Sequence, residues 1–154
     1  MDFTEVVIYC IVQIIAGIAA AVAYSSLLFT DPQALDAQPS PGFSMISAAS
    51  CEALYTFMLC FVVLNVAAAK NAVSNQWYGL AIGFVIIAGA YGAGKISGGC
   101  FNPSVAISIH AANMWVSGVA ASMWASSFFS CMVYVVAEII GAALAVLLFI
   151  LVRP

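Results

Sequence analysis

Few side chains in this sequence could do chemistry, and those few are isolated among apolar residues. Two carboxyl groups, Glu52 and Glu138, lie inside long apolar runs, and His110 is the single histidine. The five cysteines form no C-x-x-C pair, and no pattern pairs a nucleophile with a base or gathers metal ligands. We therefore expect no catalytic residue, no metal site, no cofactor and no enzymatic activity.

The run S-G-G-C-F-N-P-S at residues 97–104 carries the clearest local signal. Gly, Ser and Asn favour turns. Asn102 is a good helix N-cap, and Pro103 suits the first helical position, where its missing N–H would be unpaired in any case. Residues 104–111 could then add about two helical turns.

The start of such a helix could act on a solute in the membrane. Its unpaired N–H groups, with the side chain of Asn102, would be donors to a passing solute, and the positive end of the helix would repel cations. The simpler interpretation is that Asn102 and Pro103 only cap a short buried helix.

The composition of the chain indicates the class of protein in which these residues lie. The chain is 66% hydrophobic and 6% charged, and its mean hydropathy is +1.16. A soluble domain carries about 25% charged residues, so this chain has too few charges to cover a water-facing surface. We expect an integral, multi-pass membrane protein with the lipid bilayer as a partner, and the net charge of −3 argues against nucleic acid as one.

The apolar runs predict an all-α fold of about four transmembrane helices and one re-entrant half-helix. A spanning helix needs about 20 apolar residues. We expect a single membrane domain over residues 1–154, with a re-entrant loop and half-helix at 97–111 and with spanning helices at about 5–29, 47–69, 77–93 and 128–152.

The positions of the few basic residues favour a re-entrant segment at residues 97–111, which enters the membrane without crossing it. Four crossings place Lys70 and Arg153 on one side, which the positive-inside rule assigns to the cytoplasm-like face. If residues 97–111 crossed as well, the two basic residues would lie on opposite sides.

The polar residues inside the spans allow more than one role. Gln13 is expected to be buried and to join helices by hydrogen bonds. Glu52 and Glu138 are candidates for a proton relay, because ionisable groups within a membrane often are. No basic residue is available at their depth, so we expect both to be neutral or hydrogen-bonded to backbone N–H groups. His110 is expected to be hydrogen-bonded rather than a ligand of a metal or a pigment.

A short repeat links the first and last spans. Residues 9–17 and 134–142 each read Tyr, three apolar residues, Gln or Glu, Ile-Ile and two small residues. Repeats of this kind mark the related halves of channels and transporters. Chance similarity between two helices rich in small residues is the alternative.

Several motifs, in order, resemble the aquaporin (major intrinsic protein) family. Residues 97–104 are similar to S/T-G-x-x-x-N-P-A, and E-A-L-Y-T-F-M-L at 52–59 is similar to the family's E-x-x-x-T-F-x-L. Q-I-I-A-G at 13–17 resembles the third helix of the family, while residues 81–83 and 141–142 fit its fifth and sixth helices.

This resemblance implies a partial aquaporin-like fold and a channel for water or small neutral solutes. The pore motif would be Asn102, Pro103 and Ser104. The resemblance also implies that Glu52 accepts hydrogen bonds from the backbone of the loop. The repeat would relate the third and sixth helices of the family's two halves.

The departures from the family pattern bear on conduction. Ser104 replaces the Ala of N-P-A, and Glu138 stands where the sixth helix often has Pro. The filter positions implied by the resemblance fall on Ala90, Gly99 and Val105, where the family often has His in the fifth helix and Arg after N-P-A. Together they imply a wide, apolar and uncharged constriction.

Two functions fit these observations. The chain, which matches the family's third to sixth helices, is a divergent channel, or it is an accessory or structural subunit of a larger membrane complex without transport activity. Counterparts of the first two helices and of the first N-P-A loop are not found in these residues. Other membrane chains, as a homo-oligomer or a larger complex, are expected to cover the faces that those helices would cover.

Overall fold

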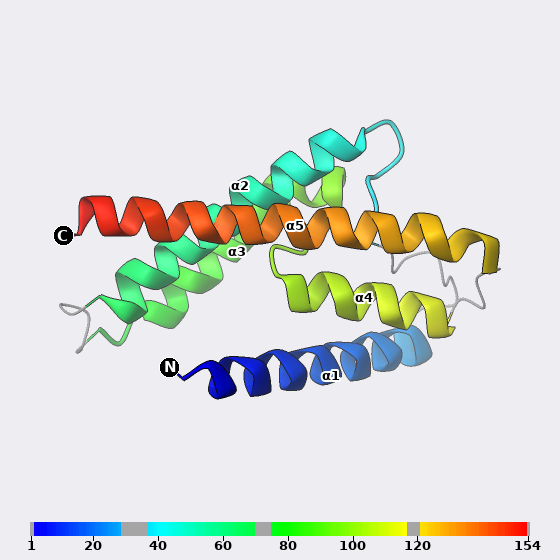
Figure 1. The fold of residues 1–154 in the computed structure, drawn as a ribbon, viewed down its shortest axis with the longest axis horizontal. Coiled ribbons are helices and arrows are strands. Elements are labelled where there is room, and N and C mark those ends of the chain that lie inside the picture. The colour runs from blue at the N-terminus through cyan, green and yellow to red at the C-terminus, as the bar shows by residue number, and fades with distance from the viewer. Residues whose placement is uncertain (1, 29–36, 70–74, 117–120, 154) are drawn as a thin grey trace. The chain divides into compact units, whose positions relative to one another are not determined.

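The computed structural model describes residues 2–28, 37–69, 75–116 and 121–153, and this part of the chain is helical without a β-strand. Figure 1 shows α1 (Phe3–Leu28), α2 (Met45–Val63), α3 (Tyr78–Ser97), α4 (Pro103–Val116) and α5 (Ala121–Val152). A π-helical turn, η2 (Leu64–Ala68), continues α2.

Four of these helices are long and apolar enough to cross a membrane: Phe3–Tyr24, Met45–Ala68, Tyr78–Ser97 and Ala125–Val152. The expectation of an all-α, multi-pass membrane protein is confirmed. Three bounds differ by four residues or more from the sequence-based ones. The short helix expected to end at residue 111 continues to Val116. The helix expected to end at residue 93 continues to Ser97, and the helix expected to begin at residue 128 begins at Ala121. Whether residues 97–111 are re-entrant stays a prediction.

The chain divides into two compact units, which we describe separately. The first comprises Met1–Gln38 and Asn102–Val135, and the second comprises Pro39–Phe101 and Val136–Pro154. The boundary falls within the 97–104 run, so the loop belongs to the second unit and the short helix α4 to the first.

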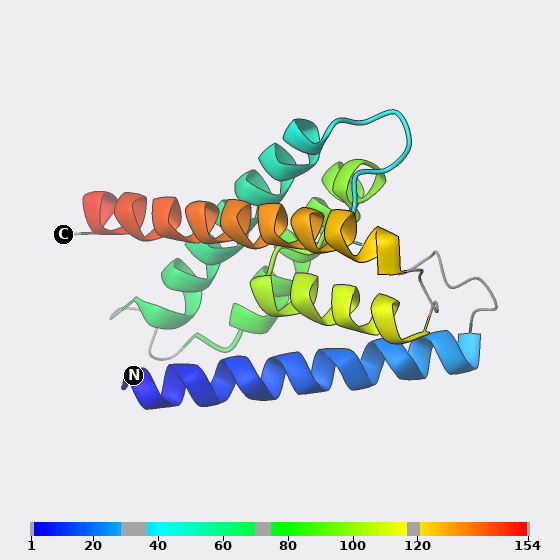
Figure 2. The same ribbon diagram turned by 45° about the vertical axis from the view of Figure 1, so that its right-hand side comes forward.

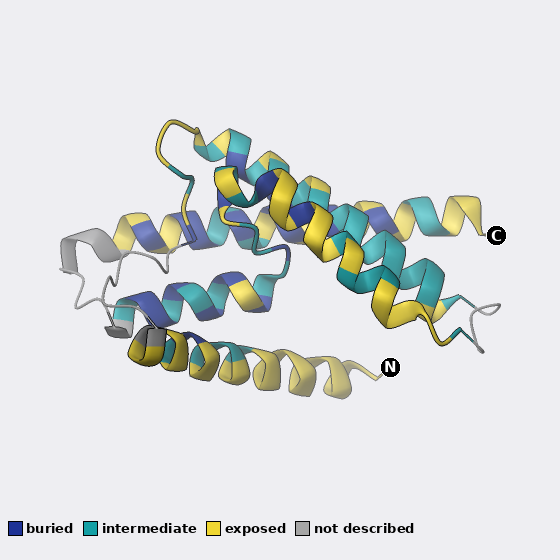
Figure 3. Ribbon diagram, turned by 180° about the vertical axis from the view of Figure 1, so that it is seen from behind, coloured by how far each residue is buried: buried dark blue, intermediate teal, exposed yellow. Residues whose placement is uncertain are grey.

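In the first unit, α1 packs against α4, and the two helices lie side by side in both views (Figures 1 and 2). The less exposed residues of α1 follow an i, i+3, i+4, i+7 pattern at Ile14, Gly17, Ile18 and Ala21. Gln13, expected to be buried, is exposed. One residue corresponds to about 100° around a helix, which rotates Gln13 away from the stripe that Ile14 begins. Figure 3 shows that most of α1 is exposed.

Close contact between α1 and α4 depends on Gly17. A Cβ at this position would collide with the Oγ of Ser108 and would lie 2.6 Å from its Cβ. The Ser108 hydroxyl lies 2.6 Å from the carbonyl oxygen of Ser104 and 3.1 Å from that of Ile14 on α1. A small residue thus brings the helices close enough for a hydroxyl to reach the neighbouring backbone, as is common in membranes.

Replacing Gly17 with alanine should therefore destabilise the first unit. We expect Gly17→Ala to lower the free energy of unfolding by about 1–3 kcal/mol, the usual cost of overpacking. The measurement is denaturant unfolding of the protein in detergent micelles. Gly83→Ala is the matched control, because nothing lies within 4 Å of a Cβ built at Gly83 in α3. The control should be neutral or slightly stabilising, since alanine favours helix. Equal effects of the two substitutions would contradict the contact.

In the second unit, α3 packs on α2, and two of its glycines accommodate aromatic rings. A Cβ at Gly92 would collide with the hydroxyl of Tyr55, and a Cβ at Gly89 would lie 2.8 Å from the ring of Phe101. Gly141 of α5 lies against the backbone of α2 in the same unit. The contact at Gly89 brings α3 against Phe101, which ends the loop that follows α3.

Candidate pore loop and half-helix

The loop after α3 begins with two glycines in left-handed conformations. Gly98 ends α3 with φ +88°, and its N–H donates to the carbonyl of Gly94 at 3.2 Å. Gly99 follows with φ +75°. Only glycine adopts such angles without strain, so these residues allow a sharp turn directly at the end of the helix.

Glu52 of α2 holds the turn from within the second unit. Its side chain is fully buried. One carboxyl oxygen, Oε1, accepts the N–H of Cys100 at 3.1 Å, and Oε2 accepts the N–H of Phe101 at 2.7 Å. A carboxyl group with both oxygens bonded to backbone donors has the structural role that the family resemblance implies for it.

These two hydrogen bonds also orient the loop carbonyls. In a trans peptide group the N–H and the C=O point in opposite directions. No cis peptide bond occurs in the described chain. Because the N–H groups of Cys100 and Phe101 point toward Glu52, the carbonyl oxygens of Gly99 and Cys100 point away from it. The loop therefore presents two successive acceptors on its side opposite α2.

Phe101 anchors the end of the loop. It is the one non-glycine residue with a positive φ in the described chain, at +54°, and its side chain is buried. Its ring packs with Tyr55 at a centroid separation of 5.5 Å and lies over Gly89. Left-handed backbone is unfavourable for a bulky residue and persists only where the surroundings impose it, often at functional sites.

The short helix α4 starts immediately after Phe101. The side-chain Oδ1 of Asn102 accepts the N–H of Ser104 at 2.9 Å, and its carbonyl accepts the N–H groups of Val105 at 2.9 Å and Ala106 at 3.0 Å. Pro103 is the first helical residue. Asn102 therefore caps the helix as its sequence position predicts, and the amide oxygen serves the cap.

Removing this cap should cost a limited amount of stability. We expect Asn102→Ala to lower the free energy of unfolding by about 1 kcal/mol. Asn102→Asp, which retains an acceptor oxygen at a helix N-terminus, should retain most of the stability. Thermal unfolding followed by circular dichroism measures both variants. An alanine variant as stable as the parent would show that the cap contributes nothing.

The filter positions that the resemblance implies lie in different units. Ala90 on α3 is exposed and Gly99 is half-buried, both in the second unit. Val105 lies in the first turn of α4, in the first unit, and is 38% exposed. None of the three side chains carries a charge. That they line a constriction together is a proposal.

The remaining polar residues have separate surroundings. His110 is buried in the first unit, with Nδ1 2.9 Å from the hydroxyl of Ser127 and its ring 6.1 Å from that of Phe128. Glu138 is fully buried on α5. Within the described residues no three potential ligands are grouped as a metal would need.

Sequence reasoning missed the aromatic support of the loop. Tyr55 and Phe101 come together although 46 positions separate them, and the glycines at 89 and 92 accommodate both rings. The available signal was a pair of glycines three residues apart, on one face of α3, facing two aromatic residues.

Four membrane-length helices, with a tight loop leading into an Asn-Pro-capped short helix, define this protein as a multi-pass α-helical membrane protein. The sequence model for the major intrinsic proteins matches residues 1–149. A probable aquaporin of NIP type from Nicotiana alata is 31% identical over 149 residues, which are 97% of this chain and 50% of that protein. The chain belongs to the major intrinsic protein family. It spans about half the length of the curated relative it matches.

Proposed function

We propose that residues 97–104 form part of the constriction of a membrane channel for water or small neutral solutes. The observation that carries the proposal is the loop held by Glu52, with its carbonyls directed away from α2, followed directly by the capped start of α4. Membership of a channel family supports it. The relative's printed name, a probable aquaporin, supports water as one solute.

The loop and the helix start offer complementary groups to a neutral solute. The carbonyls of Gly99 and Cys100 point away from Glu52 as acceptors, and the start of α4 adds the positive end of the helix, while the N–H groups of Ser104, Val105 and Ala106 are already bonded to Asn102. Water, or a small alcohol or amide, can exchange its hydrogen bonds for these. A cation is opposed by the positive end of α4, and residues 97–104 carry no positive side chain to offset the lost hydration of an anion.

The uncharged filter positions support a permissive constriction, and Val105 is the position where an added charge should narrow it. We expect Val105→Arg to lower glycerol permeability by about tenfold relative to water permeability, because the longer side chain fills space and adds a positive charge. Val105→Met, which adds length without charge, is the matched control. Light-scattering permeability of proteoliposomes measures the ratio. An unchanged ratio in the arginine variant would place Val105 outside the pathway.

The whole proposal is tested by flux through the chain itself. Proteoliposomes containing the purified chain are mixed with hyperosmotic sucrose, glycerol or urea in a stopped-flow device. We expect water and solute permeability above that of empty liposomes, without chloride or potassium conductance. Permeability equal to that of empty liposomes would overturn the proposal that this chain conducts on its own.

The alternative is an accessory or structural subunit of a larger membrane complex without transport. The observation that favours it is the uncharged set at the filter positions, where Val105 replaces the Arg that the family often has. Native purification in mild detergent distinguishes the two. Co-migration with a large complex, together with absent flux, would support the accessory role, whereas flux from the isolated chain would exclude it.

A further inference from the structure

The peptide group that joins Cys100 to Phe101 is held from both of its sides. Glu52 fixes its N–H, because the side-chain Oε2 accepts the N–H of Phe101 at 2.7 Å. The side chain of Phe101 is fixed as well, since its ring packs with Tyr55 of α2 at a centroid separation of 5.5 Å. A Cβ built at Gly89 of α3 would lie 2.8 Å from the same ring. Both supports belong to the second unit.

The backbone angle between these two supports is strained. The φ of Phe101 is +54°, a left-handed value that a bulky residue rarely adopts. Relaxation to the ordinary helical value near −63° would turn the peptide group by about 115° relative to the Phe101 side chain. The carbonyl of Cys100 belongs to this rigid peptide group and would turn with it. The direction of that carbonyl therefore depends on both supports.

Tyr55 is itself held in place by α3. Its hydroxyl lies on Gly92, where a Cβ would collide with it, and its ring lies 3.3 Å from a Cβ built at Gly89. The two glycines are three residues apart and so share one face of α3. The ring of Tyr55 has no room to move toward α3, and it therefore keeps its contact with Phe101.

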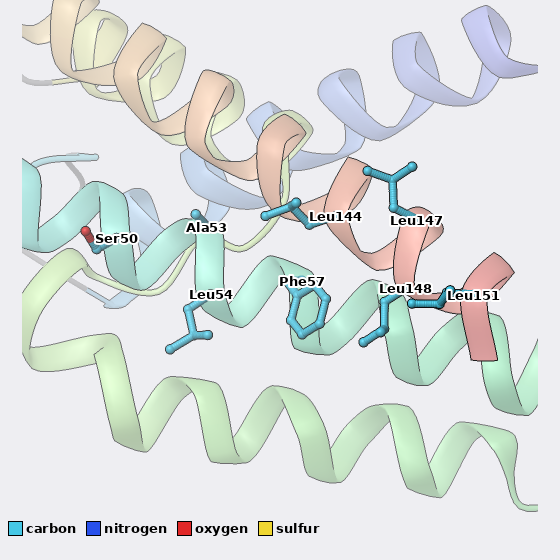
Figure 4. Close-up of a pocket in the computed structure, with 8 residues that line it drawn as sticks. All are labelled: Ser50, Ala53, Leu54, Phe57, Leu144, Leu147, Leu148 and Leu151. Carbon is cyan, nitrogen blue, oxygen red and sulfur yellow. The ribbon is translucent and has the colours of Figure 1, made fainter.

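One helix carries both supports, because Glu52 and Tyr55 are three residues apart on α2. Another face of α2 is in contact with α5, where Gly141 lies against the backbone of Ala53. Figure 4 shows the apolar groove between these two helices, and neither Glu52 nor Tyr55 lines it. A change at Tyr55 therefore acts on the loop and leaves the contact between α2 and α5 in place.

We propose that Tyr55 is a positioning residue that sets the selectivity of the channel among neutral solutes. The inference rests on the proposed function, in which the carbonyls of Gly99 and Cys100 are acceptors for the solute. By holding the ring of Phe101, Tyr55 holds the φ of Phe101 and with it the carbonyl of Cys100. Glycerol has several hydroxyl groups and can bond to both carbonyls at once, so its passage depends more on their alignment than the passage of water does.

Two substitutions at Tyr55 test the role of the ring in proteoliposomes. Tyr55→Leu removes the aromatic contact, so we expect the ratio of glycerol to water permeability to fall about tenfold, the effect of about one lost hydrogen bond. Tyr55→Phe keeps the ring and should keep the parent ratio. Tyr78→Leu is the matched control, because Tyr78 is exposed and begins α3, at the opposite end of that helix from the loop. It should leave the ratio unchanged.

Gly92→Ala reaches the same ring from α3. The added methyl group would collide with the hydroxyl of Tyr55 and displace the ring, so the ratio should fall as it does in Tyr55→Leu. Gly83→Ala is the control on the same helix, where a Cβ meets nothing within 4 Å. Combining Gly92→Ala with Tyr55→Phe removes the colliding hydroxyl and should restore part of the ratio. This series decides the question if Tyr55→Leu folds poorly by circular dichroism.

Hydrogen exchange of the Cys100 and Phe101 amides, measured by mass spectrometry in nanodiscs, reports on the loop without any flux. We expect about tenfold faster exchange in Tyr55→Leu and the parent rate in Tyr55→Phe. A parent without flux would overturn the proposed function and the selectivity role together. A conducting parent whose ratio is the same in both Tyr55 variants would overturn the role of Tyr55 alone. Faster exchange with an unchanged ratio would overturn it too, because the ring would then only stabilise the fold.

Discussion

Glu52→Leu is expected to lower the free energy of unfolding by about 2–6 kcal/mol, since it leaves two loop donors without their acceptor, at about 1–3 kcal/mol each. The donors are the N–H groups of Cys100 and Phe101, 3.1 and 2.7 Å from the carboxyl oxygens. Water cannot replace the acceptor easily, because Glu52 is fully buried and Phe101 is 5% exposed. Denaturant unfolding in micelles measures the loss.

Glu52→Gln separates the structural role from a proton relay. The amide keeps one acceptor oxygen but turns a donor toward the second N–H group, so we expect an intermediate loss of about 1–3 kcal/mol. A residue that only relayed protons would tolerate glutamine without losing stability. Glu5→Gln, at an exposed carboxyl group near the start of α1, is the matched control and should change stability little. A Glu52→Gln variant as stable as this control would remove the structural role.

Local rules explain why the start of α4 was predictable and the loop support was not. A helix cap depends on neighbouring residues, so the Asn102-Pro103 pair predicts its own geometry. The contacts of Glu52 join residues 48 and 49 positions apart. No periodicity encodes such a contact, and only the family resemblance pointed to it. The left-handed conformation of Phe101 is likewise imposed by distant partners, because its residue type disfavours it.

The faces of the spanning helices were harder to predict for a different reason. A soluble helix shows its buried face by an apolar stripe, but a membrane helix is apolar all round. The existence of four spans therefore followed from composition, whereas the orientation of α1 did not. Gln13 stands out as polar and was expected to be buried, yet the stripe against α4 starts at Ile14 and uses Gly17. In this chain small residues, more than polar ones, mark the contacts between helices.

Because small residues form the contacts between helices, Gly141→Ala should be the most destabilising glycine-to-alanine substitution in the second unit. A Cβ at Gly141 would collide with the carbonyl oxygen of Ala53, and it would lie 3.0 Å from the carbonyl carbon of Ala53 and 3.0 Å from the amide nitrogen of Phe57. These are backbone atoms within α2, so no side-chain rotation can relieve the collision. Either α5 moves away from α2, or α2 bends. We expect a loss of about 3 kcal/mol, at the upper end of overpacking costs.

Gly17→Ala and Gly83→Ala are the reference variants for the stability of Gly141→Ala. Gly17 meets a side chain, Ser108, and Gly83 has nothing within 4 Å of a built Cβ, so the same methyl group meets rigid backbone, a serine or open space at the three positions. Unfolding free energies should therefore fall in the order Gly83→Ala, Gly17→Ala, Gly141→Ala. A Gly141→Ala protein as stable as Gly83→Ala would mean that α2 and α5 do not touch at this point.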